Sequence, residues 1–223
     1  MKVERSEYDQ AKQALKHQVM DMGQQACRAV LDVADALDHF NAAHAGTIIE
    51  KDILFNRMNE RIHGECVELI ARQQPVASEL REILAELQIA VELERIADHV
   101  ADIARIIRSL SREAIPPVWS EILNMAARAE EMLRKMLGAY QNRDAVTAEV
   151  VATMDDELDR LNHQVVNEII EFMHKNPAAI RNGTRLIWLT HNLERIGDRV
   201  TNIGEQILFI ATGETRDLNR SWS

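Results

Sequence analysis

The chain has 223 residues, of which 46% are hydrophobic and 4% are aromatic, and its formal net charge at pH 7 is −10. It contains eight glycines and four prolines, too few for a loop-rich β fold, and its abundance of Leu, Ala, Ile, Glu and Arg favours helices packed on helices. Lys and Arg form no basic run, which disfavours direct binding to nucleic acid because phosphate backbones are bound mainly through basic side chains.

Two isolated cysteines, Cys27 and Cys66, belong to no Cys-x-x-Cys pair, so we expect reduced side chains in the core of a cytosolic protein. The N-terminus is charged and has no apolar segment, which argues against a signal peptide. The apolar run at residues 207–211 is far shorter than the ~20 residues of a membrane span. We therefore expect a cytoplasmic protein that reaches a membrane only through partners.

Three long helices are predicted for the first half of the chain. Apolar residues recur at three- and four-residue steps from about residue 7 to residue 43, and Gly46 is expected to cap the end of that helix. A second helix is expected up to about Arg72. A turn at Gln73-Gln74-Pro75 should then begin a third helix, to about Leu110, because proline is tolerated only in the first turn of a helix.

The second half repeats this pattern after Pro116-Pro117, the strongest break in the chain. The expected helices cover about residues 118–140, 145–174 and 177–212. Asp144 is the expected N-cap of the middle one, and Gly213 is the expected C-cap of the last.

An internal duplication explains the repeated pattern. The segments 93–104 and 193–204 agree at seven of their twelve positions when they are aligned at an offset of 100 residues. We therefore predict an all-α fold of two repeated three-helix bundles, with six long helices. The first bundle would comprise residues 1–113 and the second residues 114–213, followed by a loose tail at residues 214–223.

Both duplicated segments carry a row of oxygen-bearing side chains at four-residue spacing. The rows are Glu94, Asp98 and Asp102 in the first half and Glu194, Asp198 and Asn202 in the second. On a helix each row lies on one face, opposite an apolar row, and its like charges oppose the helix by about 0.2–0.5 kcal/mol per pair. A bound cation would reverse that effect. The simplest alternative is a solvated face whose acids pair with Arg95, Arg195 and Arg199.

The preceding helices add further carboxylates. Asp155 and Asp159 align at an offset of 103 with Asp52 and Asn56. Paired carboxylates from two neighbouring helices supply the oxygen ligands that Mg²⁺, Ca²⁺ and iron prefer, and His163 continues the row in the second half. Asn56 replaces one acid, so the second half is the better candidate. The candidate metal ligands are Asp52, Glu94, Asp98, Asp155, Asp159, Glu194 and Asp198.

An oxidoreductase with a di-iron carboxylate centre is an alternative. Glu60 and His63, like Glu171 and His174, have the Glu-x-x-His spacing of such bundles, but the two motifs do not superpose under the duplication. The chain has no G-x-S-x-G, Walker A or G-x-G-x-x-G motif. We therefore expect a protein that is not an enzyme.

Three segments resemble the PhoU family, the regulators associated with the bacterial phosphate-specific transport system. They are residues 71–81 (ARQQPVASELR), 93–99 (LERIADH) and 193–199 (LERIGDR), the last followed by Asn202-Ile203. The resemblance covers nearly the whole chain, in order and with both halves present. Ala97 stands where the family usually has Gly, and Asp102 stands where Asn is usual.

The resemblance implies six helices and a cytoplasmic negative regulator of the phosphate-starvation response. Such a protein would couple the ATPase subunit of a phosphate ABC transporter to a sensor histidine kinase, and we expect a homodimer. It also implies divalent or multinuclear metal ions (Fe, Zn, Mg or Ca) at paired E(D)xxxD motifs, which correspond here to the candidate ligands above, with Asp52 matching only in part. A further alternative is an accessory subunit of a sodium-coupled phosphate transporter.

Overall fold

The computed structural model describes residues 2–112 and 115–218, with side chains from Ser6 onward. Six long α-helices account for most of these residues, and the described part of the chain contains no strand. The all-α prediction is therefore confirmed. The elements are α1 (Lys2–Asp38), α2 (Ala42–Gln73), α3 (Ser78–Ile107), α4 (Trp119–Asn142), α5 (Ala145–Lys175), the short 3₁₀ helix η1 (Pro177–Ala179) and α6 (Ile180–Thr212).

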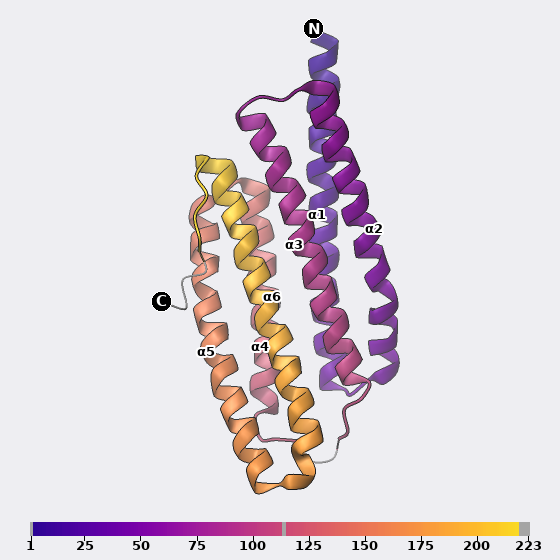
Figure 1. Cartoon of the computed structure of the whole chain (residues 1–223), viewed down its shortest axis with the longest axis vertical. Helices are drawn as coiled ribbons and strands as arrows, with labels where there is room; N and C mark the ends of the chain where they lie inside the picture. Colours follow the sequence, from indigo (N-terminus) through magenta and orange to yellow (C-terminus); the bar gives the residue numbers. More distant parts are fainter. Residues whose placement is uncertain (1, 113–114, 219–223) are drawn as a thin grey trace.

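The helices form one elongated bundle in which α3 and α6 lie side by side at the centre (Figure 1). α1 and α2 pack on α3, α4 and α5 pack on α6, and α1 also contacts α4. The apolar rows predicted for α3 and α6 are buried, which explains why these two helices are central. Their members are Ile89, Leu93, Ile96, Val100, Ile103 and Ile107, with Leu189, Leu193, Ile196, Val200, Ile203 and Ile207 at the corresponding positions.

Two predicted helix ends are wrong. Gly46 does not cap the first helix but lies inside α2, because α1 already ends at Asp38. The N-cap of α2 is Asn41, whose side-chain oxygen accepts a hydrogen bond from the backbone N–H of His44 at 3.0 Å. The third helix begins at Ser78 rather than at Pro75, after a residue with positive φ. Each boundary is set by a cap or a backbone conformation that helical periodicity does not report.

The two predicted caps in the second half are confirmed. Asp144 precedes α5, and its Oδ1 accepts a hydrogen bond from the backbone N–H of Thr147 at 3.0 Å. Gly213 follows α6 at a φ of 82°, a left-handed conformation that glycine adopts without steric cost. Its N–H donates to the carbonyl of Phe209 at 3.0 Å.

The described part of the predicted loose tail instead packs back on the second half. The backbone N–H of Leu218 donates to Glu205 Oε1 at 3.0 Å, and Arg216 forms an ion pair with Glu149 at 3.2 Å. Residues 219–223 lie outside the described residues, as does the predicted boundary between the halves at residues 113 and 114. None of the described helices is long and apolar enough to cross a membrane.

Candidate functional site

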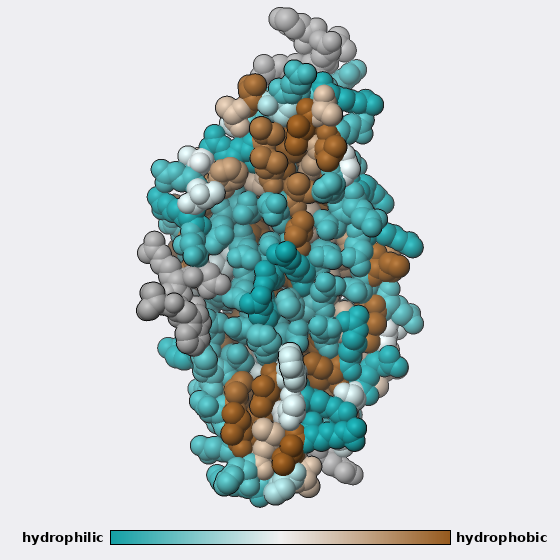
Figure 2. All heavy atoms as spheres, viewed as in Figure 1, coloured by the Kyte–Doolittle hydropathy of each residue, from teal (hydrophilic) through white to brown (hydrophobic). Residues whose placement is uncertain are grey.

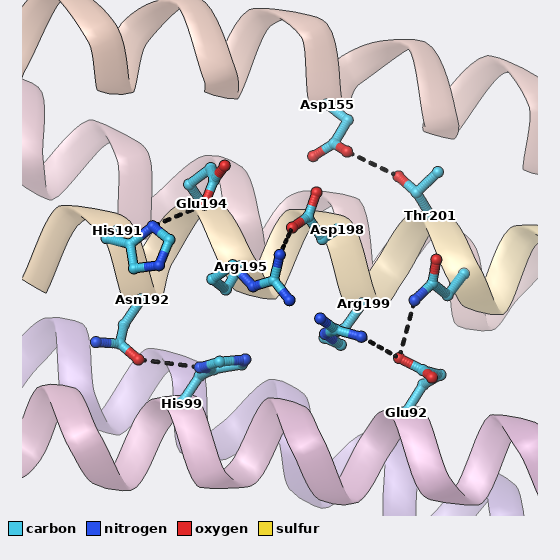
Figure 3. A network of polar contacts seen from close by, with 11 residues as sticks. Glu92, His99, Asp155, His191, Asn192, Glu194, Arg195, Asp198, Arg199 and Thr201 are labelled. Atoms are coloured by element: carbon cyan, nitrogen blue, oxygen red, sulfur yellow. Dashed lines mark hydrogen bonds and ion pairs between the residues drawn. The ribbon is translucent and has the colours of Figure 1, made fainter. Parts of the chain in front are cut away.

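A cluster of four carboxylates lies between α5 and α6. Asp155 and Asp159 come from α5, and Glu194 and Asp198 come from α6, so the fold brings together all four acids predicted for the second half. Asp155 points toward α6 from the neighbouring helix (Figure 3) and is only 4% exposed. Its Oδ2 accepts a hydrogen bond from the Thr201 hydroxyl at 3.1 Å, while its Oδ1 is buried without a hydrogen-bond partner among the described residues.

Two of the four carboxyls, those of Asp155 and Glu194, hold protons more tightly than isolated carboxyls do. Burial, together with the charges of Asp159 and Asp198, raises the pKa of Asp155 to about 8. Burial and the charge of Asp198 likewise raise the pKa of Glu194 to about 7. Both shifts disfavour the ionised forms, because charged oxygens leave water and face like charges. A bound cation would offset this cost.

Gly197 lets Asp155 approach α6 closely. A Cβ at this position would fall on Asp155 Oδ1 and would lie 2.8 Å from Leu158 Cδ2. In the first half the corresponding residue is Ala97, and the corresponding acid, Asp52, has a side chain that is 19% exposed. The single methyl group at residue 97 is therefore consistent with the shallower position of the first-half acid.

Basic side chains lie against both sets of acids. In the second half Arg195 binds Asp198 at 2.8 Å, and His191 lies 3.2 Å from Glu194 (Figure 3). The pairing of Arg195 agrees with the alternative that the acids are balanced by neighbouring arginines.

In the first half, Asp52 of α2 lies close to Asp98 and Glu94 of α3. Burial, followed by the charge of Asp98, raises the pKa of Asp52, and burial, followed by the charge of the same residue, raises the pKa of Glu94. Arg105 lies between Asp52, at 3.8 Å, and Asp102, at 2.5 Å. The first-half acids therefore have a cationic neighbour that reaches two of them at once.

Glu92, which the sequence did not single out, connects the two halves between these clusters. Glu92 of α3 is 7% exposed and binds Arg199 at 3.4 Å (Figure 3). It also binds Arg95 at 2.8 Å and Asn202 at 3.1 Å. Arg199 and Asn202 come from α6. Asn202, the third member of the acidic row of α6, and Arg199 therefore reach across to α3.

The same interface contains a second polar contact related to the first by the duplication. His99 Nδ1 lies 2.9 Å from Asn192 Oδ1 (Figure 3). At an offset of 100, Glu92 corresponds to Asn192 and Arg199 corresponds to His99. On the face of the molecule seen in Figure 1, hydrophilic side chains cover the middle and hydrophobic patches lie toward the two ends (Figure 2). Aligning the polar residues of the two halves at the offset of 100, as was done for the acidic rows, would have shown that the pair Glu92 and Arg199 corresponds to the pair Asn192 and His99.

The donor chemistry of the second-half cluster fits a hard cation, since it offers carboxylate oxygens, one of them buried without a partner. The side chains as they lie do not yet form a ligand set. Among the described residues, no group of three or more His, Cys, Asp or Glu side chains is placed to hold a metal ion. Asp198 points to Arg195, and His163 is exposed.

The di-iron alternative is wrong. It requires four side chains that converge in the core, whereas Glu60, His63, Glu171 and His174 are all exposed. Glu171 lies 3.7 Å from Lys175, one turn along α5. The apolar members of these two motifs, rather than the acids and histidines, face the other helices.

The close approach at Gly197 predicts the effect of a methyl group there. Gly197→Ala should lower the free energy of unfolding by about 1–3 kcal/mol, because Asp155 and Leu158 must move. Urea unfolding monitored by circular dichroism measures this. Gly64→Ala is the matched control, since a Cβ there meets nothing within 4 Å. It should raise stability by about 0.5–1 kcal/mol. Equal effects of the two substitutions would show that Asp155 does not pack against residue 197.

Comparison with known proteins agrees with this geometry. The family model described as PhoU domain matches the chain twice, at residues 19–107 and 122–207. A phosphate-specific transport system accessory protein PhoU homolog from Clostridium acetobutylicum is 34% identical over 206 residues, covering 92% of this chain and 94% of that protein. A homolog of the same description from Rhizobium meliloti is 31% identical over 209 residues, covering 93% and 88%.

Solved structures show the same fold. The crystal structure of PhoU from Pseudomonas aeruginosa superposes with a TM-score of 0.89 at 30% identity, covering 93% of this chain and all of that one. The phosphate transport system regulatory protein PhoU from Streptococcus pneumoniae gives a TM-score of 0.89 at 28% identity, covering 94% and 99%. With both halves matched by the family model and nearly the whole length shared with these relatives, the chain belongs to the PhoU family.

Proposed function

We propose that this protein is a negative regulator of the phosphate-starvation response that couples a phosphate ABC transporter to a sensor histidine kinase and is not itself an enzyme. Membership of the PhoU family over nearly the whole chain carries this proposal. The relatives are described as accessory proteins of the phosphate-specific transport system, and the Streptococcus pneumoniae relative is described as regulatory. An accessory protein of a transporter acts through contacts with its partners.

The central helix pair suits such a role. Asp198 and Arg199 are adjacent on α6, yet Asp198 belongs to the acidic cluster and Arg199 reaches across to Glu92 of α3. A partner or an ion that moves Asp198 would therefore also act on the contact between the halves. This arrangement gives the protein a route by which an event on α5 and α6 changes the surface formed by α1 to α3.

We also propose that the carboxylate cluster of the second half is a binding site for a metal ion. The residues that would hold it are Asp155, Asp159, Glu194 and Asp198, whose mutual repulsion and burial raise the pKa of Asp155. A hard cation would neutralise these carboxylates. The protein's own part is to keep the acids together, through Thr201 on Asp155 and through the absence of a side chain at Gly197.

Deleting the gene tests the regulatory proposal. In phosphate-rich medium, deletion should raise expression of phosphate-starvation genes several-fold, because the protein no longer inhibits signalling by the kinase. Restoring the gene should reverse the effect, and removing the kinase as well should abolish the rise. Unchanged expression in the deletion strain would contradict the proposal and favour an accessory role with a sodium-coupled phosphate transporter.

Elemental analysis tests the metal proposal. Purified protein soaked with Fe, Zn, Mg or Ca salts and then freed of excess ion should retain bound metal, and Asp198→Ala should lose most of it. Glu171→Ala is the matched control, because Glu171 is an exposed acid on α5 away from the cluster, and it should retain metal as the unaltered protein does. Failure of the unaltered protein to take up any of these ions would refute the site.

A further inference from the structure

A second buried carboxyl lies outside the acidic clusters and has no role in the function proposed above. Glu86 of α3 is 4% exposed, and its Oε2 is buried without a hydrogen bond of standard geometry to any described residue. The hydroxyls of Tyr8 of α1 and Tyr140 of α4 are buried nearby, also without a hydrogen bond of standard geometry to a described residue. The Tyr140 hydroxyl acts on the Glu86 carboxyl through a side-chain hydrogen bond. Three polar atoms from three different helices are thus buried together with few partners, which is costly in a packed interior.

The cations near Glu86 are occupied by other groups. Lys12 of α1 binds Glu82 at 2.7 Å, and Arg143, which follows α4, binds the same carboxylate at 2.9 Å. Lys16 of α1 donates to the carbonyl of Gln141 at 3.0 Å and lies 5.5 Å above the ring of Tyr140. The titratable and charged groups that face Glu86 are Tyr8, Lys12 and Lys16 of α1, Cys66 of α2, Glu82 of α3 and Tyr140 of α4.

These contacts join the two halves at one end of the bundle. Arg143 and Gln141 belong to the end of α4, whereas Glu82 and Lys16 belong to α3 and α1. Close by, Arg81 of α3 lies 5.9 Å from the ring of Phe209 near the end of α6. This is the end at which α1 begins and α6 finishes (Figure 1). Glu86 is therefore buried beneath the contacts that close this end.

The protonation state of Glu86 decides whether the contacts at this end of the bundle can all be kept. Burial raises the pKa of Glu86 to about 7, although a hydrogen bond with the Tyr140 hydroxyl opposes the rise. Since the value in an unfolded chain is 4.5, the folded state holds the proton more tightly, and the stability gained from it is lost as pH rises through 7. The ionised carboxylate would need a cation, and the nearby Lys16 donates its hydrogen bond to a neutral carbonyl rather than to a carboxylate.

We propose that protonation of Glu86 keeps the two halves of the molecule in contact at this end of the bundle. With the carboxyl protonated, Lys16 stays on the end of α4 and this end of the bundle is closed. Loss of the proton draws Lys16 from the Gln141 carbonyl toward Glu86 and admits water between α3, α1 and α4. The end of the bundle then opens more often, while the contact of Glu92 with Arg199 keeps the middle together.

Cys66 serves as a built-in reporter of this opening. Its thiol is fully buried, lies 3.8 Å from the carbonyl of Ile83 and faces Glu86. In a Cys27→Ala background, the rate at which a chromogenic disulfide reagent labels Cys66 is measured with and without Glu86→Gln. We take the ratio of the labelling rate with Glu86 present to the labelling rate of the Glu86→Gln variant, which cancels the pH dependence of the reagent itself. This ratio should rise about threefold or more between about pH 5.5 and pH 8.5.

The direction of the ratio separates opening from a simple electrostatic effect. An ionised Glu86 raises the pKa of the Cys66 thiol, so without any opening the ratio would fall as pH rises. Glu65→Gln removes another carboxylate near the same thiol, and its profile should show no such rise. Glu86→Met, which keeps the length of the side chain, should reproduce Glu86→Gln. A ratio that stays constant or falls with both variants would overturn the proposal.

Discussion

The fold depends on how α3 and α6 meet along the centre of the molecule. Their buried apolar rows bring the helices together, but the buried Glu92 must find positive partners on both helices, since an unpaired buried charge is strongly destabilising. Arg95 and Arg199 provide these partners, and Asn202 adds a hydrogen bond. Apolar contact thus supplies most of the attraction, while Glu92 adds polar contacts that reach from one half to the other.

The duplicated halves have diverged at positions where one substitution changes the chemistry. Glu92 and Arg199 form an ion pair, whereas their counterparts Asn192 and His99 form a hydrogen bond. Gly197 admits a deeply buried Asp155, whereas Ala97 faces an Asp52 that stays partly exposed. The two halves therefore share a backbone plan but offer different sites, with the more buried acidic cluster in the second half.

The sequence predicted the helices, their buried rows and the family, because periodicity and the duplicated motifs are local signals. It failed where the outcome depends on tertiary contacts. The row placed Asn202 on α6 but could not indicate that Glu92 of α3 lies within its reach. Gly46 looked like a helix end, yet Asn41 caps the next helix before it. The burial of Glu86 depends on α1, α3 and α4 together, so no single segment could have indicated it.

A double-mutant cycle between Glu92 and Arg199 tests most directly whether this ion pair stabilises the contact between the halves. Glu92→Gln, Arg199→Gln and the double variant would be unfolded in urea, with the pair Asn192 and His99 as a comparison. We expect a coupling energy of about 1–3 kcal/mol between Glu92 and Arg199. Effects that add to within about 0.3–0.5 kcal/mol would contradict the account, because the halves would then be held together without a contribution from this pair.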